Sequence, residues 1–318
     1  MKYVVFLPTT YTGGPFALLQ LSDSLTKIGH ESQVVYYDKI SRMELKNNSI
    51  SIEYSGETKF SISNIKPEVC YSFDRKDVII LPEVRLDLLK QLVNAGFSNC
   101  VFWWLSWDNA PLSELSRFEA KSALNNAIHI FQSHYAQIQA NRLGLHGAIV
   151  SDYTLFDESI NCSESFKNND ICFFPRKSIG AEKIVAELQS SFSVIRIENM
   201  SQSQVRDVLA RSKYFIDFGH HPGKDRIPRE AAIANCIPIV RFEGAARHME
   251  DVYLPRYLKI ELEMMIDAEF LAGHINKLEV NRPNILASIE PYRRKIKSEL
   301  DIFNSQVRDF CEINFAKL

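Results

Sequence analysis

The chain has 318 residues, of which 46% are hydrophobic and 24% are charged, and its formal net charge is −2. This length suggests one large domain or two ordinary ones, with enough apolar residues for real cores. The near-neutral charge argues against nucleic acid as the main partner, and no stretch approaches the roughly 18 apolar residues that a membrane span needs. The six cysteines include no CxxC pair, so we expect reduced, mostly buried thiols in a cytoplasmic protein.

The first half of the chain alternates strand-like and helix-like segments, as doubly wound α/β sheets do. Buried-type strands are predicted at residues 3–7, 32–37, 78–81, 101–105 and 129–132. Helices are predicted at 16–28, where Gly29 follows as a cap, and at 135–143. The polar, alternating segment 46–65 predicts a small antiparallel ribbon.

A linker rich in Ser, Asn and Asp at 152–170 leads into a second alternating half. Strands are predicted at 171–174, 194–197, 213–218 and 236–240, and helices at 181–188, 285–290 and 294–315. Ser201 and Gln204 form a capping-box pattern that opens a further helix. We therefore expect domains at 1–155 and 156–295, and a terminal helix (296–318) that packs back on the first domain.

The segment between the strands 213–218 and 236–240 combines groups that can hold an anion. Gly223 permits close approach of the backbone to a ligand, and Lys224 and Arg226 supply cationic donors at a helix entrance. Pro228 suits a first helical turn, and Glu230 follows it. Exposed cations in a loop are often only solvated charge, but together these residues predict a nucleotide diphosphate site at a helix N-terminus.

This segment resembles the nucleotide-sugar segment of GT-B glycosyltransferases, in which a glycine loop leads into Pro-x-Glu-Ala and a small-residue helix. Glu230 matches the glutamate that holds the ribose hydroxyls in that family, and Gly223 matches the loop glycine. Asn235 stands where the family has glycine, and Asn tolerates the left-handed conformation required there. Pro222 replaces a second family glutamate, and His221 with Pro222 resembles the His-Pro element of transferases that hold a CMP-sugar.

Further cations follow the first strand of the second half, where open sheets bind ligands. Arg176 matches an arginine that the family uses to stabilise the departing diphosphate. The family places a lysine a few residues later, where none aligns here, so Lys177 or Lys224 could take its role. A surface salt bridge is the structural alternative for Arg176 and Lys177. Arg229, in contrast, is expected to point away from the ligand.

All three tryptophans lie in Phe102–Asn109, and the last residues of this segment pass the end of a strand. Trp107 could stack on a sugar, while Asp108 and Asn109 could bond its hydroxyls. Asp108 could also serve as a general base in an inverting reaction. A structural turn explains the same residues equally well.

A second glycine loop, Gly13-Gly14-Pro15, precedes the first helix. It resembles the GT-B glycine loop that borders the acceptor cleft. Glu83, at another strand end, is a further candidate for that side. The oxidoreductase alternative is disfavoured because this loop lacks the GxGxxG pattern of dinucleotide-binding folds.

The chain resembles the retaining, nucleotide-sugar-dependent GT-B enzymes of bacterial polysaccharide synthesis. This resemblance implies two Rossmann-like doubly wound α/β domains facing a cleft. It implies transfer of a sugar from a nucleotide sugar to a carbohydrate or lipid-linked acceptor, in the cytoplasm or in peripheral contact with the inner membrane. We expect no metal and no cofactor, because such enzymes neutralise the leaving diphosphate with helix dipoles and Arg or Lys. A nucleotide-sugar epimerase, a non-catalytic carbohydrate-binding protein and either stereochemical outcome stay open.

Overall fold

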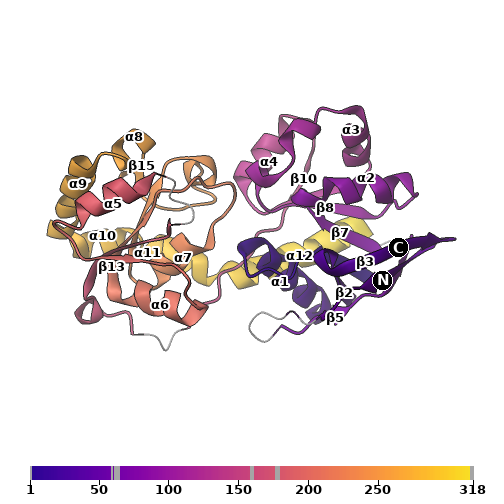
Figure 1. Cartoon of the computed structure of the whole chain (residues 1–318), viewed down its shortest axis with the longest axis horizontal. Coiled ribbons are helices and arrows are strands. Elements are labelled where there is room, and N and C mark those ends of the chain that lie inside the picture. The colour runs from indigo at the N-terminus through magenta and orange to yellow at the C-terminus, as the bar shows by residue number, and fades with distance from the viewer. Residues whose placement is uncertain (1, 59, 61–64, 158–160, 176–179, 316–318) are drawn as a thin grey trace. The chain divides into compact units, whose positions relative to one another are not determined.

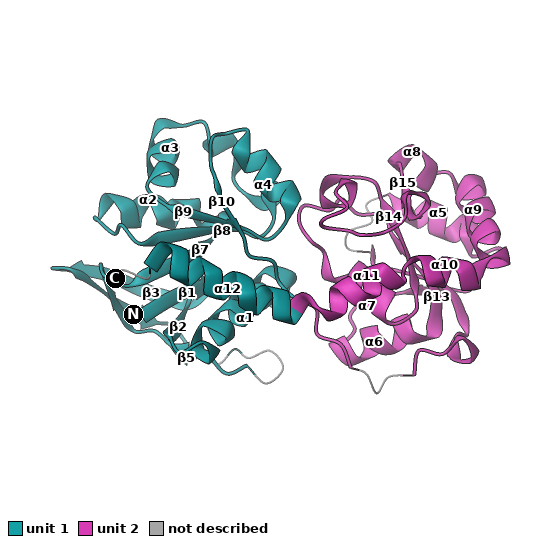
Figure 2. Cartoon of the chain, turned by 180° about the vertical axis from the view of Figure 1, so that it is seen from behind, with its two compact units in different colours: residues 1–153, 300–318 teal, residues 154–299 magenta. Residues whose placement is uncertain are grey.

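The computed structural model describes residues 2–58, 60, 65–157, 161–175 and 180–315, and the chain divides into two compact units. Unit 1 comprises Met1–Tyr153 and Leu300–Leu318, and unit 2 comprises Thr154–Glu299 (Figure 2). The chain therefore crosses between the units twice, after Tyr153 and after Glu299. The sequence placed these two boundaries after residues 155 and 295.

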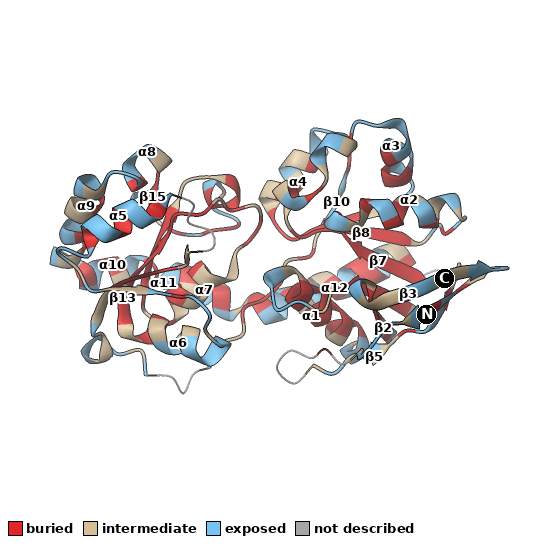
Figure 3. Ribbon diagram, viewed as in Figure 1, coloured by how far each residue is buried: buried red, intermediate tan, exposed pale blue. Residues whose placement is uncertain are grey.

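Unit 1 contains a seven-stranded sheet in which the neighbouring strands are parallel, in the order β10-β9-β8-β7-β1-β2-β5. The strands are β1 (Lys2–Leu7), β2 (Glu31–Tyr36), β5 (Glu68–Val69), β7 (Val78–Pro82), β8 (Cys100–Trp104), β9 (Ile128–Phe131) and β10 (Gly147–Ile149). The central strands are nearly continuous apolar runs because helices cover both faces of the sheet. Figure 3 shows these strands as the buried centre of the unit.

The helices of unit 1 lie on two sides of this sheet (Figure 1). They are α1 (Gly13–Lys27), α2 (Leu86–Asn94), α3 (Phe118–Asn125), α4 (His134–Asn141) and α12 (Glu299–Phe315). Val4 and Phe6 share one core with α2, α3 and α4, whereas Tyr3 packs its ring against Phe315 of α12. Successive residues of β1 point to opposite faces, so a single strand anchors both helical layers.

A three-stranded antiparallel sheet, β3-β4-β6, is also present in unit 1. Its strands are β3 (Ile40–Lys46), β4 (Ser49–Tyr54) and β6 (Ser72–Asp74). The predicted ribbon at 46–65 is therefore wrong in position, because the hairpin already turns at Asn47, which takes a φ of 55°. Asn is one of the few residues that adopt this left-handed conformation readily.

Unit 2 contains a five-stranded sheet of parallel neighbours in the order β12-β11-β13-β14-β15. Its strands are β11 (Asn169–Phe173), β12 (Val194–Arg196), β13 (Ser212–Asp217), β14 (Ile237–Arg241) and β15 (Lys259–Ile260). Its helices are α5 (Ala181–Leu188), α6 (Gln202–Arg211), α7 (Arg226–Ile233), α8 (Leu262–Met265), α9 (Ala268–Val280), α10 (Arg282–Ser288) and α11 (Glu290–Lys297). Cys172 and Phe215 pack towards α6 and α7, and Phe173 and Ile216 pack towards α5, α9, α10 and α11.

Several local predictions can be compared with the structure. The capping box of Ser201 and Gln204 is present at the start of α6, and Asn235 has a φ of 54°, so both predictions are confirmed. The six cysteines are free thiols, five of them buried. The long terminal helix predicted at 294–315 is wrong, because α11 ends at Lys297 and α12 begins at Glu299. Among the described residues, no helix has the length and apolar character to cross a membrane.

Candidate functional site

The segment between β13 and α7 carries most of the predicted donor-side residues. β13 ends at Asp217, and α7 begins at Arg226. The loop begins with a tight local turn, in which Asp217 Oδ1 accepts a hydrogen bond from the Gly219 amide at 3.0 Å. This loop therefore follows the carboxyl end of a central parallel strand, which is where open α/β sheets bind their ligands.

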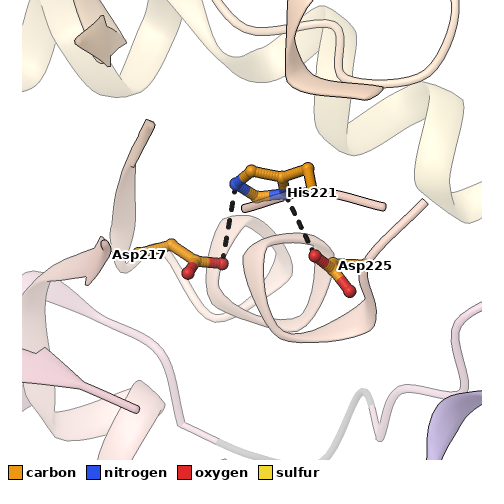
Figure 4. A group of neighbouring side chains, drawn as sticks. All are labelled: Asp217, His221 and Asp225. Atoms are coloured by element: carbon orange, nitrogen blue, oxygen red, sulfur yellow. Dashed lines mark ion pairs between the residues drawn. The ribbon is translucent and has the colours of Figure 1, made fainter. Parts of the chain in front are cut away.

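His221 lies at the centre of this loop, with its imidazole between two carboxylates (Figure 4). Its Nε2 is 3.7 Å from Asp217 Oδ2, and its Nδ1 is 3.1 Å from Asp225 Oδ2. The ring is fully buried, so it has no surface for a CMP-sugar. We therefore reassign His221 from the predicted ligand contact to a role in shaping the loop.

The same three side chains bring nitrogen and carboxylate ligand atoms within 4.8 Å of one another, close enough to be considered as a metal site. However, Asp217 and Asp225 approach opposite nitrogens of His221, and an ion on one side of the ring would be bound by only one of these nitrogens. The three side chains are therefore better described as a row, with the imidazole between the two carboxylates, than as a site that encloses one ion.

The backbone of His221 is held as tightly as its ring. The Ala245 amide donates to the His221 carbonyl at 2.8 Å. Gly244 has a φ of 55°, and a Cβ atom added there would lie only 2.0 Å from the same carbonyl oxygen. Only glycine fits this close approach, so the segment after β14 packs directly against the loop and fixes the position of the His221 carbonyl.

Lys224 and Arg229 differ from their predicted positions. Lys224 is buried, and its Nζ lies 2.7 Å from Glu299 Oε1. Arg229, expected to point elsewhere, is fully buried, and its Nη1 lies 2.9 Å from Glu299 Oε2. Burial alone would raise the pKa of the Glu299 carboxyl, but Arg229 and Lys224 outweigh it and hold that pKa below its ordinary value. Both cations are therefore part of a buried ion cluster.

Arg226 and Glu230 lie one helical turn apart at the start of α7. Arg226 Nη2 donates to Glu230 Oε1 at 2.8 Å, and both side chains are partly accessible, at 18% and 11% of their surface. Gly223 is buried just before them. These residues keep the character of a ligand site, because they present charge at a helix N-terminus without being enclosed by the core.

A small pocket lies beside Glu230, formed by α6, α7 and the segment that enters unit 2. Its lining residues are Leu155, Phe156, Asp157, Cys162, Arg206, Leu209, Glu230, Ile233 and Ala234. Apolar walls with a few charged groups are typical of small-molecule sites. The predicted cations Arg176 and Lys177 lie outside the described residues.

Two of the predicted acceptor-side groups in unit 1 have structural partners. Trp107 is buried and stacks on Trp104, with ring centroids 5.0 Å apart, which favours the structural alternative over stacking on a sugar. Asp108 accepts hydrogen bonds from the Tyr135 hydroxyl at 3.0 and 3.1 Å. Asn109 is exposed beside it.

Gly13 and Gly14 form the first turn of α1, where the backbone amides face outward. A Cβ atom at Gly13 would meet no protein atom within 4 Å, and one at Gly14 would meet only Leu105, at 3.7 Å. Glu83 is buried next to the loop that follows β8, where its Oε2 accepts a hydrogen bond from the Leu105 amide at 3.1 Å. Burial raises the pKa of Glu83 to about 8, so this carboxyl holds a proton at neutral pH.

Sequence reasoning missed Glu299, which holds both Lys224 and Arg229. No motif marks this residue, and it is separated from Lys224 by 75 positions in the numbering and from Arg229 by 70. Its position at the start of a helix gave no signal either, because the sequence predicts an unbroken helix at 294–315.

No protein-family model matches the chain, and no curated protein is similar to it in sequence. Solved structures are similar in fold at very low identity. Sucrose-phosphate synthase from Thermosynechococcus elongatus is 11% identical with a TM-score of 0.71, over 100% of both chains. An α,α-trehalose-phosphate synthase (UDP-forming) from Burkholderia vietnamiensis is 9% identical with a TM-score of 0.61, over 100% of this chain and 99% of the other.

The glucosyltransferase of phage T4, solved in complex with UDP and Mn²⁺, is 9% identical with a TM-score of 0.52, over 96% of this chain and 99% of the other. These similarities extend over essentially the whole chain and include both parallel sheets. The chain therefore has the two-domain, Rossmann-like α/β fold of the GT-B glycosyltransferases.

Proposed function

We propose that the chain transfers a sugar from a nucleotide-sugar donor to an acceptor, and that unit 2 binds the donor. The observation that carries this proposal is the Arg226–Glu230 pair at the first turns of α7, next to a small pocket and after a central strand. The fold supports it, since similar structures were solved with UDP or with UDP-2-fluoro glucose.

In this proposal Glu230 binds the ribose of the nucleotide. Arg226 engages Oε1, which orients the carboxylate and leaves Oε2 to accept a hydrogen bond from a ribose hydroxyl. The diphosphate lies against the N-terminus of α7, where Gly223, Arg226 and the helix dipole favour negative charge. As the glycosidic bond breaks, charge grows on the leaving diphosphate, and these fixed groups stabilise it. Lys224 stabilises the loop through its buried ion pair with Glu299.

Unit 1 is proposed to bind the acceptor. Gly13 and Gly14 leave room for a ligand at the start of α1, and Asn109 is exposed at the end of another strand segment. Asp108, oriented by Tyr135, is the candidate base for the acceptor hydroxyl. The resemblance to enzymes of bacterial polysaccharide synthesis supports a carbohydrate or lipid-linked acceptor. A lipid-linked one would bring the chain into peripheral contact with the inner membrane.

Thermal unfolding in the presence of UDP, GDP, ADP and CMP tests the donor site. A nucleotide at about 100 times its dissociation constant adds roughly 2.7 kcal/mol to the stability of the folded state. The proposal fails if none of these nucleotides or their sugars raises the melting temperature. Conversion of the bound sugar nucleotide into an isomer, with no acceptor present, would indicate an epimerase instead.

We further propose that transfer needs no metal ion, because Arg226 and the α7 dipole supply the positive charge that the diphosphate requires. Treatment with EDTA followed by gel filtration should leave the rate of sugar transfer unchanged within about twofold. A large loss that Mn²⁺ restores would contradict this part of the proposal and would align the chain with the phage enzyme solved with Mn²⁺.

A further inference from the structure

Glu299 lies where two distant parts of unit 2 meet. It is the last residue of unit 2, and its Oε2 accepts a hydrogen bond at 3.0 Å from the amide of Thr154, the first residue of the unit. The two segments by which the chain enters and leaves unit 2 are thus joined through one side chain. Only 4% of the Glu299 side chain is exposed, so this contact is shielded from water.

The same carboxylate reaches the candidate donor loop. Lys224 Nζ lies 2.7 Å from Oε1, and Arg229 Nη1 lies 2.9 Å from Oε2. Charged hydrogen bonds in a buried setting are short and directional, so they fix the position of the groups that make them. Glu299 therefore joins three segments: the entry into unit 2, the exit from it, and the loop before α7.

Arg229 extends this connection into the backbone of the loop. Its Nε donates to the Asp225 carbonyl at 3.1 Å, and its Nη2 donates to the Lys224 carbonyl at 2.9 Å. Asp225 in turn lies against His221. The conformation of the two residues before Arg226 thus depends on a guanidinium that Glu299 holds in place.

We propose that Glu299 is a positioning residue that couples the donor loop to both chain crossings. This inference rests on the proposed function, because it assigns the loop to the donor. Glu299 touches no donor atom itself. Its loss should loosen the loop and the two crossings together. It should lower kcat more than it weakens nucleotide binding, because Glu230 and the other α7 residues that line the pocket stay in place.

Hydrogen exchange of Glu299→Gln tests the connection without any ligand. The change is isosteric but removes the charge that Lys224 and Arg229 share. We expect faster exchange than in the wild type in residues 150–157, 219–226 and 296–302 together, and unchanged exchange in α9. Faster exchange confined to 296–302 would overturn the proposal.

Glu290→Gln is the matched control, because Glu290 forms a single pair with Arg293 at 2.7 Å on the surface of α11. It should alter neither exchange in the loop nor kcat. If Glu299→Gln does not fold, Lys224→Met provides the second variant. That substitution leaves Arg229 and Glu299 as a balanced pair, so it should loosen 219–226 while the link between the crossings persists.

The nucleotide that raises the melting temperature of the wild type is then added in saturating amounts. In the wild type, exchange should slow in the loop and at both crossings. In Glu299→Gln it should slow in the loop alone, with kcat reduced at least tenfold and nucleotide affinity changed less than threefold. Equal losses of kcat and affinity would contradict a positioning role. Absence of nucleotide binding in the wild type would refute the proposed function. The ligand-free exchange experiment would still show whether Glu299 links the loop to the two crossings.

Discussion

At the scale of single residues, burial separates the groups that can meet a ligand from those that cannot. Arg226 and Glu230 keep accessible surface, whereas Lys224 and Arg229 are enclosed around Glu299. All of these residues read alike in the sequence, as charges near a helix start. The distinction depends on a carboxylate that follows them by about 70 positions, and no local pattern reveals such a partner.

Glu230→Gln should weaken nucleotide binding by about 10- to 100-fold. A charged hydrogen bond contributes about 1.5–3 kcal/mol, and the amide also loses its pairing with Arg226. Isothermal titration with the nucleotide that stabilises the wild type is the measurement. Glu263→Gln, an exposed carboxylate on α8, is the control and should bind normally. Unchanged affinity in a folded Glu230→Gln protein would remove this residue from the donor site.

Glu83 should make the stability of unit 1 depend on pH. Its pKa is about 8 in the folded chain and near 4.5 when exposed, so the unfolded chain releases the proton first. The contribution of Glu83 to stability is therefore fully present below about pH 4.5 and declines as pH rises towards 8.

Glu83→Gln should remove this decline, because an amide keeps the Leu105 contact and does not ionise. The variant should gain stability relative to the wild type between pH 5 and pH 8, as followed by tryptophan fluorescence in urea. Glu119→Gln, at an exposed position of α3, should show no such trend. If the difference in unfolding free energy between Glu83→Gln and the wild type is constant from pH 5 to pH 8, Glu83 is ionised in the folded chain.

At the scale of elements, the sequence predicts structure well wherever the signal is local. The Ser201 capping box and the left-handed Asn235 occur as expected, because each depends on residues within one turn. The start of α12 was missed because nothing local interrupts a helix at Ser298. The break coincides with the exit from unit 2, where the long-range contacts of Glu299 determine the course of the chain.

The loop before α7 depends on Gly244, which belongs to a separate segment. Gly244→Ala would place a Cβ atom 2.0 Å from the His221 carbonyl oxygen at a φ of 55°. We expect a loss of about 2 kcal/mol or more in the stability of unit 2, together with weaker nucleotide binding. Urea unfolding followed by circular dichroism would measure the loss.

Gly273→Ala is the matched control for this prediction. Gly273 lies within α9, and an added Cβ atom there meets nothing within 4 Å. Alanine should stabilise this helix by about 0.5–1 kcal/mol, since glycine is unfavourable in a helix interior. A Gly244→Ala protein as stable as the wild type would show that the His221 carbonyl can move without cost.

At the scale of the whole molecule, each unit has its own core, but unit 1 is assembled from both ends of the chain. Ser24 Oγ donates to Asn304 Oδ1 at 2.8 Å, and the Ser151 amide donates to Gln306 Oε1 at 2.9 Å. Residues of the last helix therefore bind to segments from the other end of the chain, and Phe315 packs against Tyr3 of the first strand. The alternating α/β segments predict that helices form layers on the two faces of a sheet. They do not specify which of these layers the last helix joins.

Phe303→Ala tests whether α12 is an integral part of unit 1. Phe303 is fully buried and packs against Tyr153, with ring centroids 5.4 Å apart. Removing a buried aromatic side chain costs about 3–5 kcal/mol. The three tryptophans, at positions 103, 104 and 107, all lie in unit 1, so their fluorescence in urea should report this loss directly. Ile302→Ala, at an exposed neighbouring position, should change the midpoint little. If the fluorescence transition of Phe303→Ala matches that of the wild type, unit 1 folds without the last helix.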